Sequence, residues 1–351
     1  MTFEEFIMQA REMNASDIHL TVGAPTVVRV NGELRKYTEL SDQVVNRTIL
    51  SILSAEQEKM LTEGKDIDLS FELKNGARQR VNVFRQSGKL AACIRLLNAE
   101  IPTLEELKMP PVLLEFAKKR RGLVLVTGPT GAGKSTTLAA LMEYINKTRA
   151  CHVITIEDPI EYRYKQEKAT IHQRELGRDV PSFHEALRSA LREDPDVILI
   201  GEMRDYETIS LAMTAAETGH LVFGTLHTSS AAQTVDRIID ACPIHSQDQV
   251  RSQLASMIQG IIAQTLIPRA DGKGRVAAVE VMIGTDAIRN LIRSAKINMM
   301  ETTMAAGARD GMCTLNASLA NLYKTGQISY ETALEYATDR GEMEKKLLSG
   351  I

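Results

Sequence analysis

The chain has 351 residues, of which 44% are apolar and 25% are charged, the composition of a globular protein with room for two domains. A net charge of −3, only 4% aromatic residues and no tryptophan argue against binding through bulk positive charge or base stacking, so we expect no nucleic acid partner. No apolar run approaches the roughly 18 residues of a membrane-spanning helix, so we expect no direct membrane insertion.

The start of the chain and the cysteines indicate a cytoplasmic protein. Residues Met1–Glu5 are acidic and lack the basic and then apolar profile of a signal peptide. The four cysteines, at positions 93, 151, 242 and 313, are far apart and form no C-x-x-C pair. We therefore expect buried, reduced thiols, with neither a zinc site nor a disulfide framework.

Residues 1–98 are predicted to form an N-terminal α+β domain. Helical periodicity covers Phe3–Met13 and Ser41–Glu63. The pairs Asn31-Gly32 and Asn75-Gly76 are strong turn signals and predict two hairpins. The predicted strands are Ser16–Leu20, Val27–Val30, Leu34–Tyr37, Ile67–Leu73, Arg80–Phe84 and Leu90–Leu97.

Residues 99–104, with Pro102, are predicted to be an interdomain linker. Residues 105–284 then alternate apolar strands with helices, which is typical of an α/β core. The predicted strands are Leu123–Val126, His152–Ile156, Val197–Ile200, Leu221–Leu226 and Val276–Met282, and their continuous apolar character predicts a sheet covered on both faces. Ser182 opens a predicted helix that reaches about Glu193. Residues 285–351 are predicted to be a C-terminal helical region.

A glycine-rich segment, Gly128-Pro129-Thr130-Gly131-Ala132-Gly133-Lys134-Ser135, matches the P-loop pattern G-x-x-x-x-G-K-[ST]. An apolar strand precedes it and a predicted helix, Thr136–Asn146, follows it. Glycines let the backbone wrap around phosphate oxygens, so that N–H groups and the helix N-terminus face the anion. We therefore predict that Gly128 to Ser135, together with Thr136, bind ATP. Lys134 is predicted to reach the β- and γ-phosphates, and Ser135 to supply an oxygen to Mg²⁺.

Acidic residues that follow two of the predicted strands are candidates for the metal and the attacking water. Glu202 ends the run Asp196–Glu202, in which Gly201 stands where a Walker-B aspartate is usual. We predict Glu202 as the catalytic base or water positioner. Glu157 and Asp158 end another strand, where open α/β sheets bind ligands. They are predicted to belong to the metal site, where they hold a metal-bound water or orient the nucleophile. A turn at Asp158-Pro159 is the alternative for this acidic segment.

Two histidines flank the predicted strand Leu221–Leu226. His220 precedes it and His227 follows it, an interval of seven that does not suit a simple metal pair. A lone histidine is more often structural. In a P-loop protein, however, both could sense the γ-phosphate, and we predict nucleotide-linked roles for both, with His227 also catalytic.

Taken together, these motifs resemble the secretion ATPase superfamily, which drives type II secretion and type IV pili. The resemblance covers nearly the whole chain. Glu157–Glu161 matches the family's acidic "Asp box", Ile198–Glu202 its atypical Walker B, and His220 with His227 its "His box". It implies a RecA-like P-loop NTPase core, a PAS-like N-terminal domain and a C-terminal helical region.

Within the superfamily the chain is most similar to the pilus retraction ATPases. It begins at the family's first domain and lacks the tetracysteine insertion common in assembly and export ATPases. Residues 287–293, Ala-Ile-Arg-Asn-Leu-Ile-Arg, match the retraction signature A-I-R-N-L-I-R-E, with Ser294 in place of the final glutamate. The resemblance also implies that Arg80 and Arg95 reach the nucleotide from the first domain; from the residues alone they would be ordinary solvated charges.

The resemblance implies a homohexameric ATPase that retracts type IV pili. Its implied partners are an inner-membrane pilus platform protein and other pilus ATPases, and its implied location is cytoplasmic, at the inner face of the cytoplasmic membrane. Three alternatives stay open. They are an ATPase of pilus assembly or of type II or IV secretion, a low-turnover accessory or regulatory paralogue, and, least favoured, a nucleic-acid motor.

Overall fold

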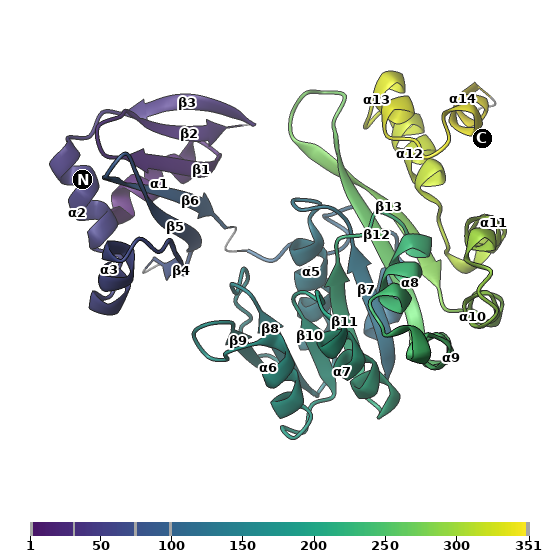
Figure 1. Ribbon diagram of the computed structural model, residues 1–351. Coiled ribbons are helices and arrows are strands. Elements are labelled where there is room, and N and C mark those ends of the chain that lie inside the picture. Colours follow the sequence, from purple (N-terminus) through teal and green to yellow (C-terminus); the bar gives the residue numbers. More distant parts are fainter. Residues whose placement is uncertain (1–2, 31, 74–75, 98–99, 349–351) are drawn as a thin grey trace. The chain divides into compact units, whose positions relative to one another are not determined.

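The computed structural model describes residues 3–30, 32–73, 76–97 and 100–348. The chain divides into two compact units (Figure 1). The first unit comprises Met1–Glu100 with Pro159–Arg163, and the second comprises Ile101–Asp158 with Tyr164–Ile351.

The first unit is built on a six-stranded sheet in the order β3-β2-β1-β6-β5-β4, in which every neighbouring pair is antiparallel. The strands are β1 (Ala15–Thr21), β2 (Thr26–Val30), β3 (Glu33–Thr38), β4 (Ile67–Glu72), β5 (Arg78–Gln86) and β6 (Lys89–Leu96). Helices α1 (Phe3–Glu12), α2 (Asp42–Leu50) and α3 (Ala55–Thr62) pack on the sheet and close one apolar core.

The predicted helix Ser41–Glu63 is two helices rather than one. Ser54 begins α3 with a capping box, because its side chain accepts from the Gln57 N–H while the Gln57 side chain accepts from the Ser54 N–H. The two predicted hairpins are present. Asn31 and Asn75 lie outside the described residues, and Gly32 and Gly76 have the positive φ angles of +88° and +82° that such turns require.

The second unit is built on a seven-stranded sheet in the order β13-β12-β7-β11-β10-β8-β9. Its strands are β7 (Gly122–Thr127), β8 (His152–Glu157), β9 (Thr170–Glu175), β10 (Val197–Ile200), β11 (Leu221–Leu226), β12 (Ile258–Pro268) and β13 (Arg275–Ile283). All neighbouring pairs are parallel except the edge pair β12–β13. Strands β9 and β12 are absent from the sequence-based prediction.

Helices cover both faces of this sheet, as the continuous apolar strands predict. In β7, Leu123 and Leu125 join one core cluster, whereas Val124 and Val126 join the cluster on the other face. The helices are α4 (Leu113–Ala117), α5 (Lys134–Thr148), α6 (Phe183–Ala190), α7 (Tyr206–Glu217), α8 (Ala231–Asp240) and α9 (Gln247–Met257). Helix α6 ends three residues before the predicted Glu193, and short turns follow it.

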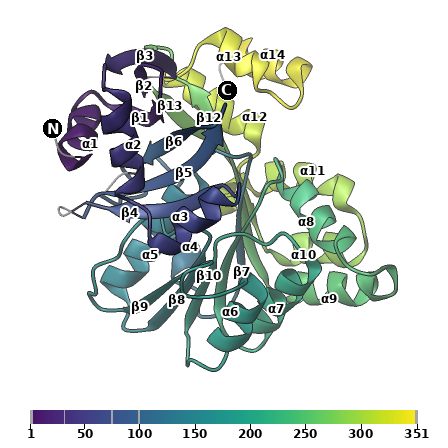
Figure 2. The same ribbon diagram turned by 60° about the vertical axis from the view of Figure 1, so that its left-hand side comes forward.

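From residue 285 onward, the described chain forms helices and 3₁₀ turns, as the sequence indicates. The helices are α10 (Asp286–Arg293), α11 (Met300–Ala306), α12 (Leu315–Lys324), α13 (Tyr330–Glu335) and α14 (Arg340–Leu348). Helix α10 packs against α9, and α12 packs on β13 (Figure 2). Within the described residues, no helix has both the length and the apolar character needed to cross a bilayer.

Candidate nucleotide site

The P-loop joins the carboxyl end of β7 to the N-terminus of α5. Gly128, Gly131 and Gly133 have φ angles of +143°, +79° and +87°, which L side chains rarely adopt. A Cβ at Gly128 would also lie 2.2 Å from the carbonyl oxygen of Gln264. The conformation of the loop therefore requires these glycines. The loop continues directly into the N-terminus of α5, where free backbone N–H groups favour the binding of an anion.

Lys134 lies at the first position of α5, and its ammonium group turns back into the loop. Its Nζ donates to the carbonyl oxygens of Gly128 at 2.7 Å and Pro129 at 3.1 Å. Ser135 follows on the exposed side of the same helical turn. This places a cation inside the cradle and a hydroxyl at its rim, the arrangement that phosphate oxygens and a coordinated Mg²⁺ require.

Gln264, on β12, hydrogen-bonds the P-loop and was not identified from the sequence. Its buried amide donates from Nε2 to the carbonyl oxygen of Ala132 at 2.7 Å. Its Oε1 accepts from the hydroxyl of Thr137 at 2.8 Å. One side chain therefore fixes the loop before the lysine and the helix after it, and no local motif marks a residue this far along the chain.

Glu202 lies just beyond β10, at the same edge of the sheet as the P-loop. The parallel registers place Ile200 opposite Gly224, and Leu226 opposite Thr127, so one strand, β11, separates Glu202 from the P-loop strand. The Glu202 carboxylate lies 2.9 Å from His227 Nε2 and 2.6 Å from a terminal nitrogen of Arg204. The structure thus brings together Glu202 and His227, two of the predicted site residues, and adds Arg204.

The charges around Glu202 keep it ionised. Burial alone would raise the pKa of Glu202, but the hydrogen bond and charge of Arg204, with a smaller contribution from His227, hold this pKa below its usual value. The hydrogen bond to Glu202 and, more weakly, the charge of Asp158 raise the pKa of Arg204. A carboxylate of this kind can accept a proton from water or orient it.

Gly201 has a steric explanation. A Cβ at this position would lie 3.1 Å from the Ile156 carbonyl oxygen and 3.2 Å from Glu157 Cα. The Gly201 N–H donates to that same Ile156 oxygen at 2.7 Å, and the Thr225 hydroxyl donates to the Gly201 carbonyl. The absence of a side chain thus allows the ends of β8 and β10 to lie close together.

Glu157 ends β8, the strand next to β10, and Asp158 follows it. Glu157 Oε1 accepts from the Thr155 hydroxyl at 2.7 Å and from Gln173 Nε2 at 3.3 Å, whereas Asp158 is exposed. In the described part of the chain, no three His, Cys, Asp or Glu side chains converge on a possible metal position. The donor set fits Mg²⁺, which keeps several waters and takes its other ligands from one or two protein oxygens and the nucleotide phosphates.

His220 lies at the edge of the sheet opposite the P-loop. It precedes β11, level with the start of β7, and its Nδ1 hydrogen-bonds the Ala215 carbonyl oxygen at 2.9 Å. The six residues of β11 separate it from His227 by about 20 Å. The nucleotide-linked role of His220 therefore gains no support from this geometry and stays a prediction, whereas His227 lies in the proposed site.

Arg80 and Arg95 belong to the first unit, where they face each other across the β5–β6 pair. Arg95 donates to Asp17 at 3.0 Å, and Arg80 lies 3.9 Å from Asp68. Like charges in directly opposite positions disfavour a sheet unless they are compensated, and each arginine here has its own carboxylate. The pair presents two neighbouring, partly exposed guanidinium groups, which suit an anionic ligand.

A model of the family described as "Type II/IV secretion system protein" matches residues 1–340. The chain belongs to this family. Two known proteins are similar to this chain along most of their length. The "Type IV pilus retractation ATPase PilT" of Pseudomonas aeruginosa is 49% identical over 339 residues, which is 96% of this chain and 98% of that protein. The "Twitching motility protein" of Neisseria gonorrhoeae is 48% identical over 319 residues, 90% of this chain and 85% of that protein.

Solved structures of the family agree with the fold. A crystal structure of "the Pilus Retraction Motor PilT and Bound ADP" superposes with a TM-score of 0.91 at 47% identity, covering 98% of this chain and 99% of that one. The predicted fold class, an α/β P-loop core with a further α+β part and C-terminal helices, is therefore confirmed.

Proposed function

We propose that this chain is an ATP-hydrolysing motor that powers type IV pilus retraction. The observation that carries the proposal is the Glu202 carboxylate, held by His227 and Arg204 at the sheet edge that also bears the P-loop. The similarity to a pilus retraction ATPase over almost the whole chain points to the same work.

In this proposal, residues 128–136 hold the ATP phosphates and Lys134 neutralises the β- and γ-phosphates. When bound, Mg²⁺ supplies positive charge that offsets the charge developing on the phosphoryl oxygens. Ser135 would hold it directly, and Glu157 and Asp158 would orient its waters.

Glu202 acts on the attacking water. Its lowered pKa keeps the carboxylate ionised and able to align one water for in-line attack on the γ-phosphate. His227 Nε2 holds one carboxylate oxygen and so fixes the direction of the other. Arg80 and Arg95 then supply charge to the γ-phosphate, since a guanidinium fork matches phosphoryl oxygens.

Mechanical work follows if the binding and release of the γ-phosphate shift the N-terminal domain (residues 1–98) about the linker at residues 99–104. We propose that six copies form a ring, located at the inner face of the cytoplasmic membrane. Sequential shifts would turn an inner-membrane platform protein and dismantle the pilus, with other pilus ATPases as further partners.

The test is Glu202→Gln, which keeps the shape of the side chain and removes its basicity. We expect a fall in steady-state ATP hydrolysis of at least about 100-fold, with ADP binding unchanged. Glu335→Gln, on the exposed side of α13, is the matched control and should hydrolyse ATP at the wild-type rate. Wild-type turnover in Glu202→Gln would refute the assignment.

A second candidate is a low-turnover accessory paralogue, and Ser294 is the observation that favours it. Its hydroxyl donates to the Asn290 carbonyl oxygen of α10 at 2.8 Å. Because a serine stands here, the end of α10 lacks the carboxylate of the retraction signature. Complementation of a hyperpiliated retraction mutant separates the two: a main motor restores twitching alone, whereas an accessory paralogue does not. An ATPase of pilus assembly or secretion would instead be needed for pili or export to appear at all.

A further inference from the structure

The first turn of α8 begins four residues after His227 and is attached to the sheet. The buried carboxylate of Glu280, on β13, accepts from the Ala231 N–H at 2.7 Å. The N–H of Leu315, the first residue of α12, also hydrogen-bonds Glu280. Because helix N-termini favour negative charge, one carboxylate stabilises the starts of two helices.

Thr234 makes a second attachment from the same side of α8. Ala231 and Thr234 are three residues apart and so lie on one face of the helix. The fully buried Thr234 hydroxyl lies 3.5 Å from that of Thr127, a weak contact between two enclosed groups. Thr127 immediately precedes Gly128 of the P-loop.

These two attachments are at one level of the sheet. The strand registers pair Thr127 with Ala263 and Ala263 with Glu280, so the three residues form a row across β7, β12 and β13. The first turn of α8 is therefore fixed to the row of residues from which the P-loop leaves the sheet.

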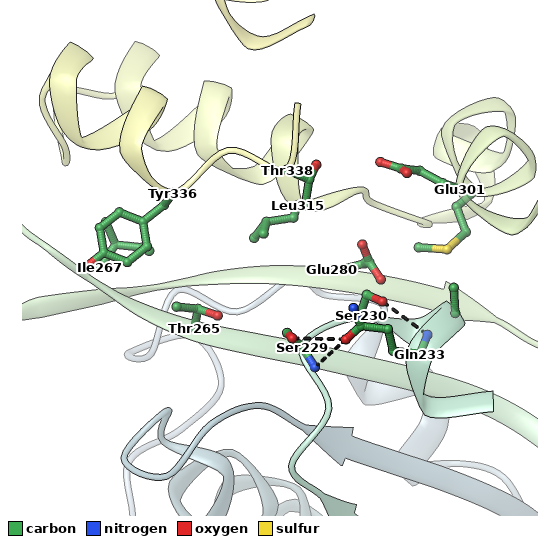
Figure 3. A pocket seen from close by; sticks show the side chains of 12 residues that line it. Ser229, Ser230, Gln233, Thr265, Ile267, Glu280, Glu301, Leu315, Tyr336 and Thr338 are labelled. Atoms are coloured by element: carbon green, nitrogen blue, oxygen red, sulfur yellow. Dashed lines mark hydrogen bonds between the residues drawn. The ribbon is translucent and has the colours of Figure 1, made fainter. Parts of the chain in front are cut away.

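The loop between His227 and α8 is held by the same turn. The Thr228 hydroxyl lies 2.7 Å from Thr234 Oγ1, and Thr234 donates to the Ser230 carbonyl oxygen at 2.7 Å. Figure 3 shows the adjoining bonds, in which Ser229 donates to Gln233 Oε1 and Ser230 Oγ accepts from the Gln233 N–H, with Glu280 beside them. All three residues that follow His227 are thus held by α8, and the same loop lines a hollow of about 430 Å³.

We infer that Thr234 and Glu280 are positioning residues of the ATPase site, which fix the first turn of α8 to the P-loop row and thereby set His227 against Glu202. Neither side chain needs to touch nucleotide for this. The inference rests on the proposed function, because it assigns to this turn the geometry of the pair that hydrolyses ATP. His227 Nε2 lies 2.9 Å from the Glu202 carboxylate. If His227 moved, this hydrogen bond would weaken and the carboxylate would no longer align the water.

The first experiment is Thr234→Val, which keeps the buried shape and removes the hydroxyl. We expect kcat for ATP to fall about tenfold and KM to change less than about twofold, since the P-loop itself is untouched. The acid limb of the pH profile should move to higher pH, because a displaced His227 no longer helps to lower the pKa of Glu202. Thr234→Ser returns the hydroxyl and should restore kcat. Glu280→Gln, which keeps an acceptor oxygen but loses the charge, should also lower kcat at unchanged KM.

Thr208→Val is the matched control. Thr208 is also buried on a helix, but its hydroxyl makes no hydrogen bond to any described residue, so this variant should keep the wild-type kcat and pH profile. A merely structural role for Thr234 would lower the melting temperature and leave kcat and the acid limb of the folded protein unchanged.

A double-mutant cycle gives a second, independent readout. Thr228→Val removes the loop side of the same hydrogen bond at a partly exposed position and should fold readily. If Thr228 is held only through Thr234, Thr228→Val should also lower kcat, and the double variant should fall no further than Thr234→Val alone. Multiplying effects, or wild-type kcat in either single variant, would overturn the inference, and Thr228→Val carries this test alone if Thr234→Val does not fold. A wild-type protein without ATP hydrolysis would instead refute the proposed function.

Discussion

Glu202 is the residue on which the proposed chemistry depends most, and Arg204 helps to keep the Glu202 carboxylate ionised. Glu202 must be ionised to act on water, and the Arg204 hydrogen bond and charge lower its pKa against the effect of burial. In Arg204→Gln the pKa of Glu202 rises, so protonation begins at a higher pH. We expect the acid limb of kcat against pH to move to higher pH, with little change at alkaline pH.

A comparison of the pH profiles at low and high salt checks this cause. Arg204 is largely exposed, with 67% of its side chain accessible, so salt should screen its effect and reduce the difference between Arg204→Gln and wild type. Coincident acid limbs at low salt would show that Arg204 does not control Glu202.

The site residues differ in how far the sequence could predict them. The P-loop and Glu202 follow from short motifs whose spacing is fixed by one turn or one strand end. Arg204 carried no signal, because an arginine near an acid is common on any surface. The strand Leu221–Leu226 was predicted correctly, and it places His220 and His227 at opposite edges of the sheet, because one precedes the strand and the other follows it. The role of His220 therefore stays a prediction.

At the scale of elements, β12 links the P-loop to the core through Gln264. Gln264→Met would keep the volume but leave the Ala132 carbonyl oxygen and the Thr137 hydroxyl without this partner. Buried polar groups without partners cost about 1–3 kcal/mol each, so we expect lower stability and ADP affinity reduced by roughly tenfold or more. Calorimetric titration with ADP and denaturant unfolding measure the two effects, and unchanged ADP affinity would show that β12 does not shape the cradle.

The same strand also passes close to α4, and Gly260 makes this possible. A Cβ there would lie 2.3 Å from the ring of Phe116 and 3.0 Å from the Met282 carbonyl oxygen. Gly260→Ala should lower the free energy of unfolding by about 1–3 kcal/mol, the usual effect of overpacking. In Gly341→Ala, the control on α14, the new Cβ comes no nearer to any atom than 3.5 Å, so stability should not fall.

Strands β9 and β12 escaped prediction for different physical reasons. Strand β9 lies at the edge of the sheet and has a single apolar residue, Ile171, so it lacks the continuous apolar run of its neighbours. Strand β12 begins at Ile258, directly after α9 ends at Met257, with no turn residue between them to mark the boundary. In both places tertiary packing, rather than local propensity, decides the structure.

For the whole molecule, the two arginines of the first unit provide a test of whether that unit takes part in hydrolysis. We expect Arg80→Gln and Arg95→Gln each to lower kcat for ATP by at least about tenfold, because each removes charge from the proposed γ-phosphate contact. The melting temperature of Arg80→Gln should change little, since an exposed ion pair contributes little to stability. Arg95→Gln leaves the buried Asp17 carboxylate without its ion-pair partner and should lower the melting temperature, so its kcat is measured on the folded protein. Arg35→Gln, which breaks the exposed pair with Glu33 on β3, controls for loss of positive charge and should keep full activity.

Retraction by the assembled machine can be examined at Ser294. If the missing glutamate weakens the output of the motor, Ser294→Glu should improve twitching in a complemented retraction mutant. ATP hydrolysis by the purified protein should stay the same, because α10 hydrogen-bonds Ile258, which pairs with the start of β7 at the edge opposite the P-loop. Equal twitching by both forms would show that the serine does not limit retraction.

The hydrogen bonds from Gln264 to the P-loop change how family members that bind nucleotide should be distinguished from those that do not. A survey that inspects only positions 128–135 would count any chain with those eight residues as able to bind nucleotide. The cradle also needs a donor and an acceptor on one side chain long enough to reach both Ala132 and Thr137 from β12. Among the uncharged side chains, glutamine meets both requirements, because its amide carries a donor and an acceptor at the end of a long side chain. A paralogue with an apolar residue at this position would therefore carry a complete motif and still be a poor nucleotide binder.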